Sequence, residues 1–145
     1  MTMLNSPKNS PALQLRLGIL YARIALGTAF LSAVASRFGI WDWKIGLEKF
    51  ANFTQYTAEV NSFMPAFAIP FLAWAATLAE SSLGIALILG FRLRWVALGS
   101  SLLLALFGTA MAISFGIKSP LDYSVFSASA GALLLALYPA GESGA

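Results

Sequence analysis

The chain has 145 residues, of which 59% are hydrophobic and only 10% charged, whereas a soluble domain usually carries about 25% charged residues. This composition excludes an ordinary soluble domain and predicts one membrane-embedded domain. The absence of Cys and His excludes disulfides, thiol redox chemistry, zinc fingers and iron–sulfur clusters held by the chain's own thiolates. The net charge of +3 comes from basic residues that flank apolar segments, so we expect no nucleic-acid binding. The lack of Cys and His removes the commonest metal ligands, so we predict no metal site, although carboxylates could still hold a hard cation and Met or Tyr a haem.

The first 14 residues are polar, contain Pro7 and Pro11, and show no apolar periodicity, so we predict a disordered tail. Four apolar segments follow. Each approaches the length of about 20 residues that a helix needs to cross the hydrocarbon core of a bilayer. The predicted spans cover residues 15–36, 66–89, 95–115 and 120–138. We therefore predict an all-α integral membrane protein, an antiparallel bundle of four transmembrane helices.

Residues 37–65 are too polar, and their apolar runs too short, to cross a membrane. We predict an interfacial amphipathic helix over residues 41–63. Asp42 is the predicted N-cap. Helical spacing places Phe50, Phe53, Tyr56, Val60 and Phe63 on one side, and Glu48, Asn52, Gln55 and Glu59 on the other. Trp41 and Trp43 are expected at headgroup depth. The alternative is that this segment caps the mouth of the bundle and forms part of a site.

The fourth span has a clear start signal. Ser119 is a predicted N-cap, Pro120 occupies the first helical position, and Asp122 lies in the first turn, where a carboxylate favours the helix dipole. Small residues also recur every four positions in the first span, from Gly18 to Ala22 and through Ala25, Ala29 and Ala33, and again in the fourth. Such repeats are compatible with close helix packing, although Ala and Gly are common in every membrane helix.

Four spans place both termini on one side of the membrane. Four basic residues fall on each side: Lys8, Arg16, Arg92 and Arg94 with the termini, and Arg37, Lys44, Lys49 and Lys118 opposite. Arg92 and Arg94 lie in a short turn, whereas the lysines opposite are spread over a longer loop. The positive-inside rule therefore favours cytoplasmic termini and a cell (inner) membrane location.

Glu80 lies near the middle of the second span, where a carboxylate costs about 2.5–3.5 kcal/mol on insertion scales unless it is neutral, paired or facing a polar cavity. Arg23 lies at a similar estimated depth in the first span, which runs in the opposite direction. We therefore predict that Arg23 and Glu80 form a buried polar pair. A proton or ligand site and a structural pair satisfy the same physics, so both roles stay open.

A second group of charges falls near the opposite surface: Arg37, Glu59 and Asp122. These are the outer-mouth candidates. One reading is ordinary ion pairing between helix ends and headgroups. The other is a polar site at the mouth of the bundle, in which Arg37 and Asp122 contact an anion or a quinone head.

Three stretches together resemble the DoxX family of small four-helix membrane proteins. They are RLGILYARIALGTAFLSAVASRFG, LAWAATLAESSLGIALILGFRLRW with its mid-helix Glu80, and SPLDYSVF. The resemblance covers about residues 16–138. It associates the chain with the DoxD small subunit of a thiosulfate:quinone oxidoreductase and with membrane complexes that handle sulfur or oxidative stress. Arg37 matches the basic residue that the family commonly places after the first span.

The resemblance implies a multi-pass membrane subunit that accompanies a membrane oxidoreductase and interacts with quinone, without a covalently bound cofactor. Because the chain has no Cys or His, we expect it not to be catalytic by itself, and redox work would need a bound quinone or a partner subunit. Two alternatives remain. One is a structural scaffold or assembly subunit of a larger membrane complex, and the other is a small transporter or channel formed by a homo-oligomer. The lipid bilayer is a partner in every case.

Overall fold

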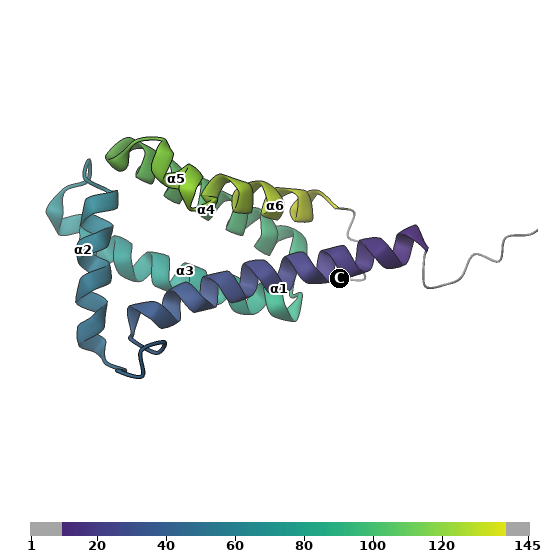
Figure 1. Cartoon of the computed structure of the whole chain (residues 1–145), viewed down its shortest axis with the longest axis horizontal. Coiled ribbons are helices and arrows are strands. Elements are labelled where there is room, and N and C mark those ends of the chain that lie inside the picture. Colours follow the sequence, from purple (N-terminus) through teal and green to yellow (C-terminus); the bar gives the residue numbers. More distant parts are fainter. Residues whose placement is uncertain (1–9, 139–145) are drawn as a thin grey trace, which may run out of the picture.

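The computed structural model describes residues 10–138, and over this range the regular structure is entirely helical (Figure 1). Three long α-helices, α1, α3 and α4, are joined by shorter elements. In chain order the elements are α1 (Pro11–Arg37), η2 (Leu47–Lys49), α2 (Phe50–Val60), η3 (Ala66–Ala68), α3 (Ile69–Leu89), α4 (Leu93–Phe115), α5 (Lys118–Asp122) and α6 (Val125–Leu137). The predicted all-helical class is confirmed.

Three segments are long and apolar enough to cross a membrane: α1, α4 and the stretch from Ala66 to Leu89 that contains α3. Between 17% and 33% of the residues in their most apolar windows are buried inside the protein. The outward faces carry large apolar side chains, such as Leu17, Phe71 and Leu102. An apolar surface of this extent needs a hydrocarbon surrounding, so these helices face lipid.

The first helix begins earlier than the apolar pattern predicts. Ser10 is its N-cap: the Ser10 hydroxyl accepts a hydrogen bond from the backbone N–H of Leu13 at 3.2 Å, and Pro11 occupies the first helical position. The prediction of a disordered tail is therefore wrong for residues 10–14. The rest of that predicted tail, residues 1–9, lies outside the described residues.

The helices form two main pairs, α1 with α3 and α4 with the shorter α6 (Figure 1). At the crossing of α1 and α3, a Cβ added to Gly27 would lie 2.8 Å from the carbonyl oxygen of Gly84, so only glycine permits this approach. The predicted seam is wrong at Gly18, where an added Cβ would meet nothing within 4 Å. The close contact is made by a glycine pair outside the four-residue repeat.

The α4–α6 pair is held by two serines. The Ser101 hydroxyl donates to the Ser129 carbonyl at 2.8 Å, and the Ser129 hydroxyl donates to the Ser101 carbonyl at 2.8 Å. This reciprocal bonding goes beyond the packing role expected for hydroxyls in these helices. Next to it, the ring of Phe126 fills the space that a Cβ on Gly108 would occupy.

The apolar core is uneven along the bundle. A larger cluster includes Ile19, Leu87, Leu93 and Leu135 and joins α1, α3, α4 and α6 near the α3–α4 turn. A smaller cluster, of Val60, Ala110 and Met111, lies under α2. The α2 helix lies across this second end, transverse to α1 and α3 (Figure 1). The thinner core at the α2 end leaves room for a cavity.

The predicted interfacial helix is present but shorter. It begins at Phe50, and Asp42 caps nothing, because residues 38–46 form turns in which the Lys44 N–H donates to the Gly39 carbonyl at 3.2 Å. Gly39 has φ +72°, a conformation that favours glycine and stops α1. The two-sided pattern holds in part. Phe50 and Val60 are buried and the polar residues on the opposite side are exposed, but Tyr56 and Phe63 are exposed as well.

The fourth predicted span is not one helix. It is divided into α5 and α6 at Ser124, which has φ +56°. Ser119 is not an N-cap, because α5 already begins at Lys118 and Pro120 is buried inside it. The remaining apolar helix, α6, has 13 residues.

Candidate functional site

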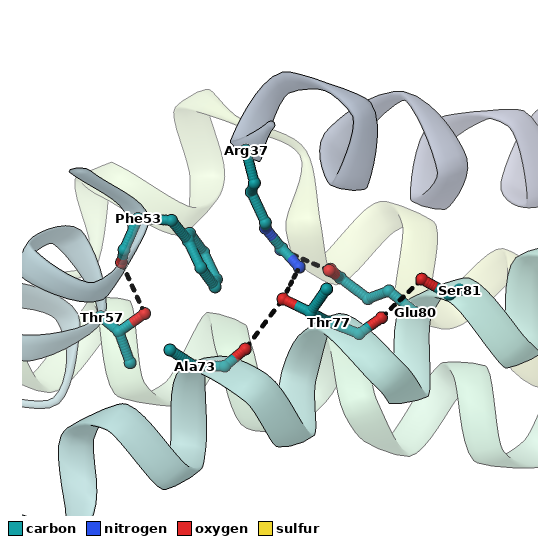
Figure 2. Close-up of polar contacts among 7 residues, drawn as sticks. All are labelled: Arg37, Phe53, Thr57, Ala73, Thr77, Glu80 and Ser81. Carbon is teal, nitrogen blue, oxygen red and sulfur yellow. Dashed lines mark hydrogen bonds and ion pairs between the residues drawn. The ribbon is translucent and has the colours of Figure 1, made fainter. Parts of the chain in front are cut away.

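A buried ion pair joins α1 to α3 at the end of the bundle covered by α2 (Figure 2). Arg37, the last residue of α1, contacts Glu80 Oε2 through Nη2. Helical side chains lean toward the N-terminus of their own helix, and α1 and α3 run in opposite directions. The two side chains therefore lean toward each other. Arg37 is 9% exposed and Glu80 is 4% exposed.

Two further groups hold the Arg37 guanidinium in place. Nη1 donates to the Thr77 hydroxyl at 2.9 Å, and that hydroxyl in turn donates to the Ala73 carbonyl at 2.8 Å. The Phe53 ring of α2 lies against the guanidinium, with the ring centroid 3.6 Å from Cζ (Figure 2). Cation–π contacts of this kind are strongest where water is excluded. Three helices thus fix one cation.

The ion pair lies in the wall of an apolar cavity of about 730 Å³. This volume is within the range of about 300–1,000 Å³ that is typical of small-molecule sites. The cavity is enclosed by side chains of α2, α3 and α4, among them Phe53, Leu72, Ala76, Leu106 and Ile113. Arg37 and Glu80 are its only charged lining residues in the described part of the chain. Leu106 and Ile113 are exposed, so the cavity opens toward the lipid-facing surface between α3 and α4.

Tyr56 also lines this cavity and is 44% exposed. Burial raises the pKa of Tyr56 above the usual value of a tyrosine, and the charges of Tyr123 and Glu59 raise it further. The phenol therefore stays neutral at physiological pH. A neutral phenol can donate one hydrogen bond to an acceptor inside the cavity.

The predicted pairing of Arg23 with Glu80 is wrong. Arg23 instead donates from Nε to the Leu87 carbonyl and from Nη2 to the Ile88 carbonyl, both at 3.0 Å. These carbonyls are among the last of α3, which have no partner within the helix. The estimated depths assumed that residue 15 lies level with Leu89 at the end of α3, but α1 extends well beyond that end (Figure 1). In the actual register Arg23 faces a level about 12 Å along the axis of α3 from Glu80.

The outer-mouth candidates do not come together. Arg37 is engaged by Glu80 and Thr77, as described above. Asp122 pairs with Lys118 one turn away, and both side chains are largely exposed. Glu59 lies on the exposed side of α2.

Sequence reasoning missed Thr77 and the polar role of Phe53. Thr77 lies three residues before Glu80, a helical spacing that puts both on one face and was available as a signal. Phe53 was placed on the apolar side of α2, but its stacking on Arg37 has no sequence signal. Among residues 10–138 no group of three or more candidate metal ligands is present.

These observations define a class: a small multi-helix membrane protein with a buried ion pair beside an apolar cavity. The sequence model of the DoxX family matches residues 18–115, which is more than half of the chain. The chain belongs to the DoxX family, and the predicted membership is confirmed over these residues, whereas the stretch SPLDYSVF lies outside the match. Neither a curated protein nor a solved structure matches it.

Proposed function

We propose that this chain binds the head of a membrane quinone beside Arg37 and Glu80, as an accessory subunit of a membrane oxidoreductase. The observation that carries the proposal is the buried ion pair in the wall of an otherwise apolar cavity of about 730 Å³. A quinone has the same division of polarity, with two carbonyl oxygens on a ring and a long apolar tail. Buried charges in membrane proteins are expensive and usually serve a function.

The residues present fit such a ligand. The Arg37 guanidinium has five N–H donors, and its contacts with Glu80 and Thr77 use only part of them. Tyr56 offers a second donor on the same cavity. Glu80 Oε2 has no hydrogen-bond partner, so its one polar contact is the ion pair with Arg37. The open side of the cavity, at Leu106 and Ile113, suits an apolar tail that extends into lipid.

In this proposal each side chain has one task. Arg37, fixed by Thr77 and Phe53, orients a ring carbonyl and stabilises negative charge on it. Glu80 keeps the guanidinium in the cavity wall and can hold a proton next to the ring. A bound quinone would supply two-electron, two-proton chemistry, and the electrons would be exchanged with a partner subunit. The chain is then not catalytic by itself.

We also propose that the protein lies in the cell membrane with its termini in the cytoplasm. The exposed arginines Arg16, Arg92 and Arg94 lie toward the end with the α3–α4 turn. The α2 end carries Lys44, Lys49 and Lys118, but these lie on separate segments, whereas Arg92 and Arg94 lie in one short turn. This distribution supports the orientation that the positive-inside rule favours.

Quinone titration of the purified protein tests the proposal. The protein, in lipid nanodiscs, is titrated with a short-chain benzoquinone while tryptophan fluorescence is recorded. We expect saturable binding, at least tenfold weaker in Arg37→Gln and unchanged in Arg94→Gln, which removes an exposed arginine at the other end of the bundle. Tyr56→Phe removes only a hydroxyl and should weaken binding severalfold without affecting folding. Equal binding by all of these variants would refute the proposal.

The same preparation addresses the alternatives. Recovery of partner proteins from mild detergent, with no quinone bound or extractable, would favour a structural scaffold. The buried ion pair is compatible with that role, because a structural pair also relieves the cost of its two charges. Ion flux across liposomes that contain the protein alone would favour an oligomeric transporter or channel.

A further inference from the structure

A second cavity lies on the other side of Arg37. It has a volume of about 490 Å³ and is formed by the end of α1, the turns that follow, and α2. Its lining is more polar than that of the first cavity and includes Ser36, Asp42, Lys49 and Asn52. Ser36, Asp42 and Asn52 are exposed, so this cavity opens to the aqueous surface beneath the turns. We refer to it as the vestibule.

The vestibule and the apolar cavity share a wall. Arg37, Phe53 and Tyr56 line both of them. Phe53 and Tyr56 are three residues apart on α2 and therefore lie on one side of that helix. The Phe53 ring covers the guanidinium from the α2 side (Figure 2). One arginine and two aromatic rings thus separate a polar space from an apolar one.

We infer that this wall is the route by which water and protons reach the Arg37–Glu80 pair, and that Phe53 is its gate. This inference rests on the proposed function, because a route for protons to the ion pair is useful only if a quinone head binds there. A headgroup held in the apolar cavity cannot exchange protons with the surrounding hydrocarbon. The vestibule is the nearest polar space, and the guanidinium already borders it. Movement of one ring would bring vestibule water into contact with Glu80.

The absence of cysteine makes the test direct, because any introduced cysteine is the only thiol in the protein. Ala33 lines the vestibule alone, and Ala76 lines the apolar cavity alone. Ala33→Cys and Ala76→Cys proteins are reconstituted in liposomes, and a membrane-impermeant cationic methanethiosulfonate is applied on both sides. Lys118→Cys, at an exposed position outside both cavities, gives the rate for an open site. We expect Ala33→Cys to react within about tenfold of that rate, and Ala76→Cys at least a hundredfold more slowly.

The gate is tested by removing its ring. Adding Phe53→Ala to Ala76→Cys should raise the labelling rate at least tenfold, because the ring no longer separates the two cavities. Phe63→Ala is the matched control: the same side-chain atoms are lost from the apolar cavity, but Phe63 does not line the vestibule. The control should leave the rate within twofold of the single variant. If Phe53→Ala does not fold, Phe53→Leu should raise the rate by a smaller factor.

Three results would overturn the inference: no labelling of Ala33→Cys, rapid labelling of Ala76→Cys with Phe53 intact, or equal acceleration by the Phe53 and Phe63 variants. None of these measurements uses quinone. A protein with gated water access that binds no quinone would refute the proposed function and leave the gate standing. A protein that binds quinone with a sealed wall would do the opposite.

Discussion

Two arginines of α1 reach across to α3, on opposite sides of the Gly27–Gly84 crossing. Arg37 meets a carboxylate, a hydroxyl and an aromatic ring, and it borders two cavities. Arg23 meets two backbone carbonyls at the end of α3, and no described cavity is lined by it. The same residue type on the same helix thus serves two purposes. At one end it completes a neighbouring helix, and at the other it forms a candidate site.

The two arginines differ in whether their surroundings leave space for a ligand. Arg23 satisfies carbonyls that a helix C-terminus always exposes, so its contacts need no further partner. Arg37 is held by side chains that also face a cavity large enough for a ligand. A charged residue within a membrane helix is therefore interpreted by its partners and surroundings, and not by its depth alone.

The largest effect is expected at the Arg37–Glu80 pair. Arg37→Gln leaves Glu80 buried without its cation and should lower the free energy of unfolding by about 3–5 kcal/mol. The double variant Arg37→Met with Glu80→Met should recover most of this loss, because no buried charge remains. Unfolding by dodecyl sulfate in mixed micelles, followed by circular dichroism, measures both. A loss below about 1 kcal/mol for Arg37→Gln would mean that the site is hydrated, as in an exposed ion pair.

The crossing between the two arginines gives the next effect. Gly27→Ala brings a methyl group to 2.8 Å from the Gly84 carbonyl oxygen, so the two backbones must separate. We expect a loss of about 1–3 kcal/mol, typical of overpacking. Gly18→Ala on the same helix meets nothing within 4 Å and should be neutral or slightly stabilising. Equal effects of the two substitutions in the same unfolding assay would show that the crossing is looser than described.

Arg23→Leu should cost less, about 1.5 kcal/mol, because two hydrogen bonds to carbonyls are lost but water at the end of the bundle replaces part of them. It should leave quinone affinity unchanged, whereas Arg37→Gln reduces it. This contrast separates the two arginines by function and not by stability alone. A matching loss of affinity in Arg23→Leu would remove the distinction drawn here.

The smallest effect is expected at the exposed pair of Lys118 and Asp122. These side chains are 84% and 56% exposed. Either single substitution to Ala should change the free energy of unfolding by about 0.5 kcal/mol or less. The pair is a reference for the buried one: similar charges in contact, but surrounded by water. High salt should abolish its contribution and leave that of Arg37–Glu80 largely intact.

The sequence was sufficient for the three long helices, because length and apolar content suffice to recognise a span. The sequence was not sufficient to predict the register of α1 against α3, that is, which residues of the two helices lie at the same level. Arg23 and Glu80 were each identified as buried charges, but the assumption that the first span starts level with the end of α3 placed Arg23 opposite the wrong part of that helix. The helix break at Ser124 was also missed, because a serine with positive φ carries no sequence signal.

The candidate site was recovered in pieces. Arg37 and Glu80 were both named, but in different groups, because a long arginine at a helix end was expected to reach the surface and not to fold back along its own helix. The turn that ends α1 was readable, since Gly39 and Gly46 flank it. Asp42 was instead predicted to be the N-cap of the interfacial helix, because aspartate is a preferred residue at that position. The helix does not begin there, so the side chain has no helix to cap.

The break at Ser124 has a consequence for the surrounding bilayer. The 13 residues of α6 extend only about 20 Å, short of a hydrocarbon core of about 30 Å. On this side of the molecule, α5 and the turn at Ser124 must supply the remaining length along α4. The crossing is therefore jointed, and a change in bilayer thickness would act on the turn at Ser124 before it acts on the continuous helices.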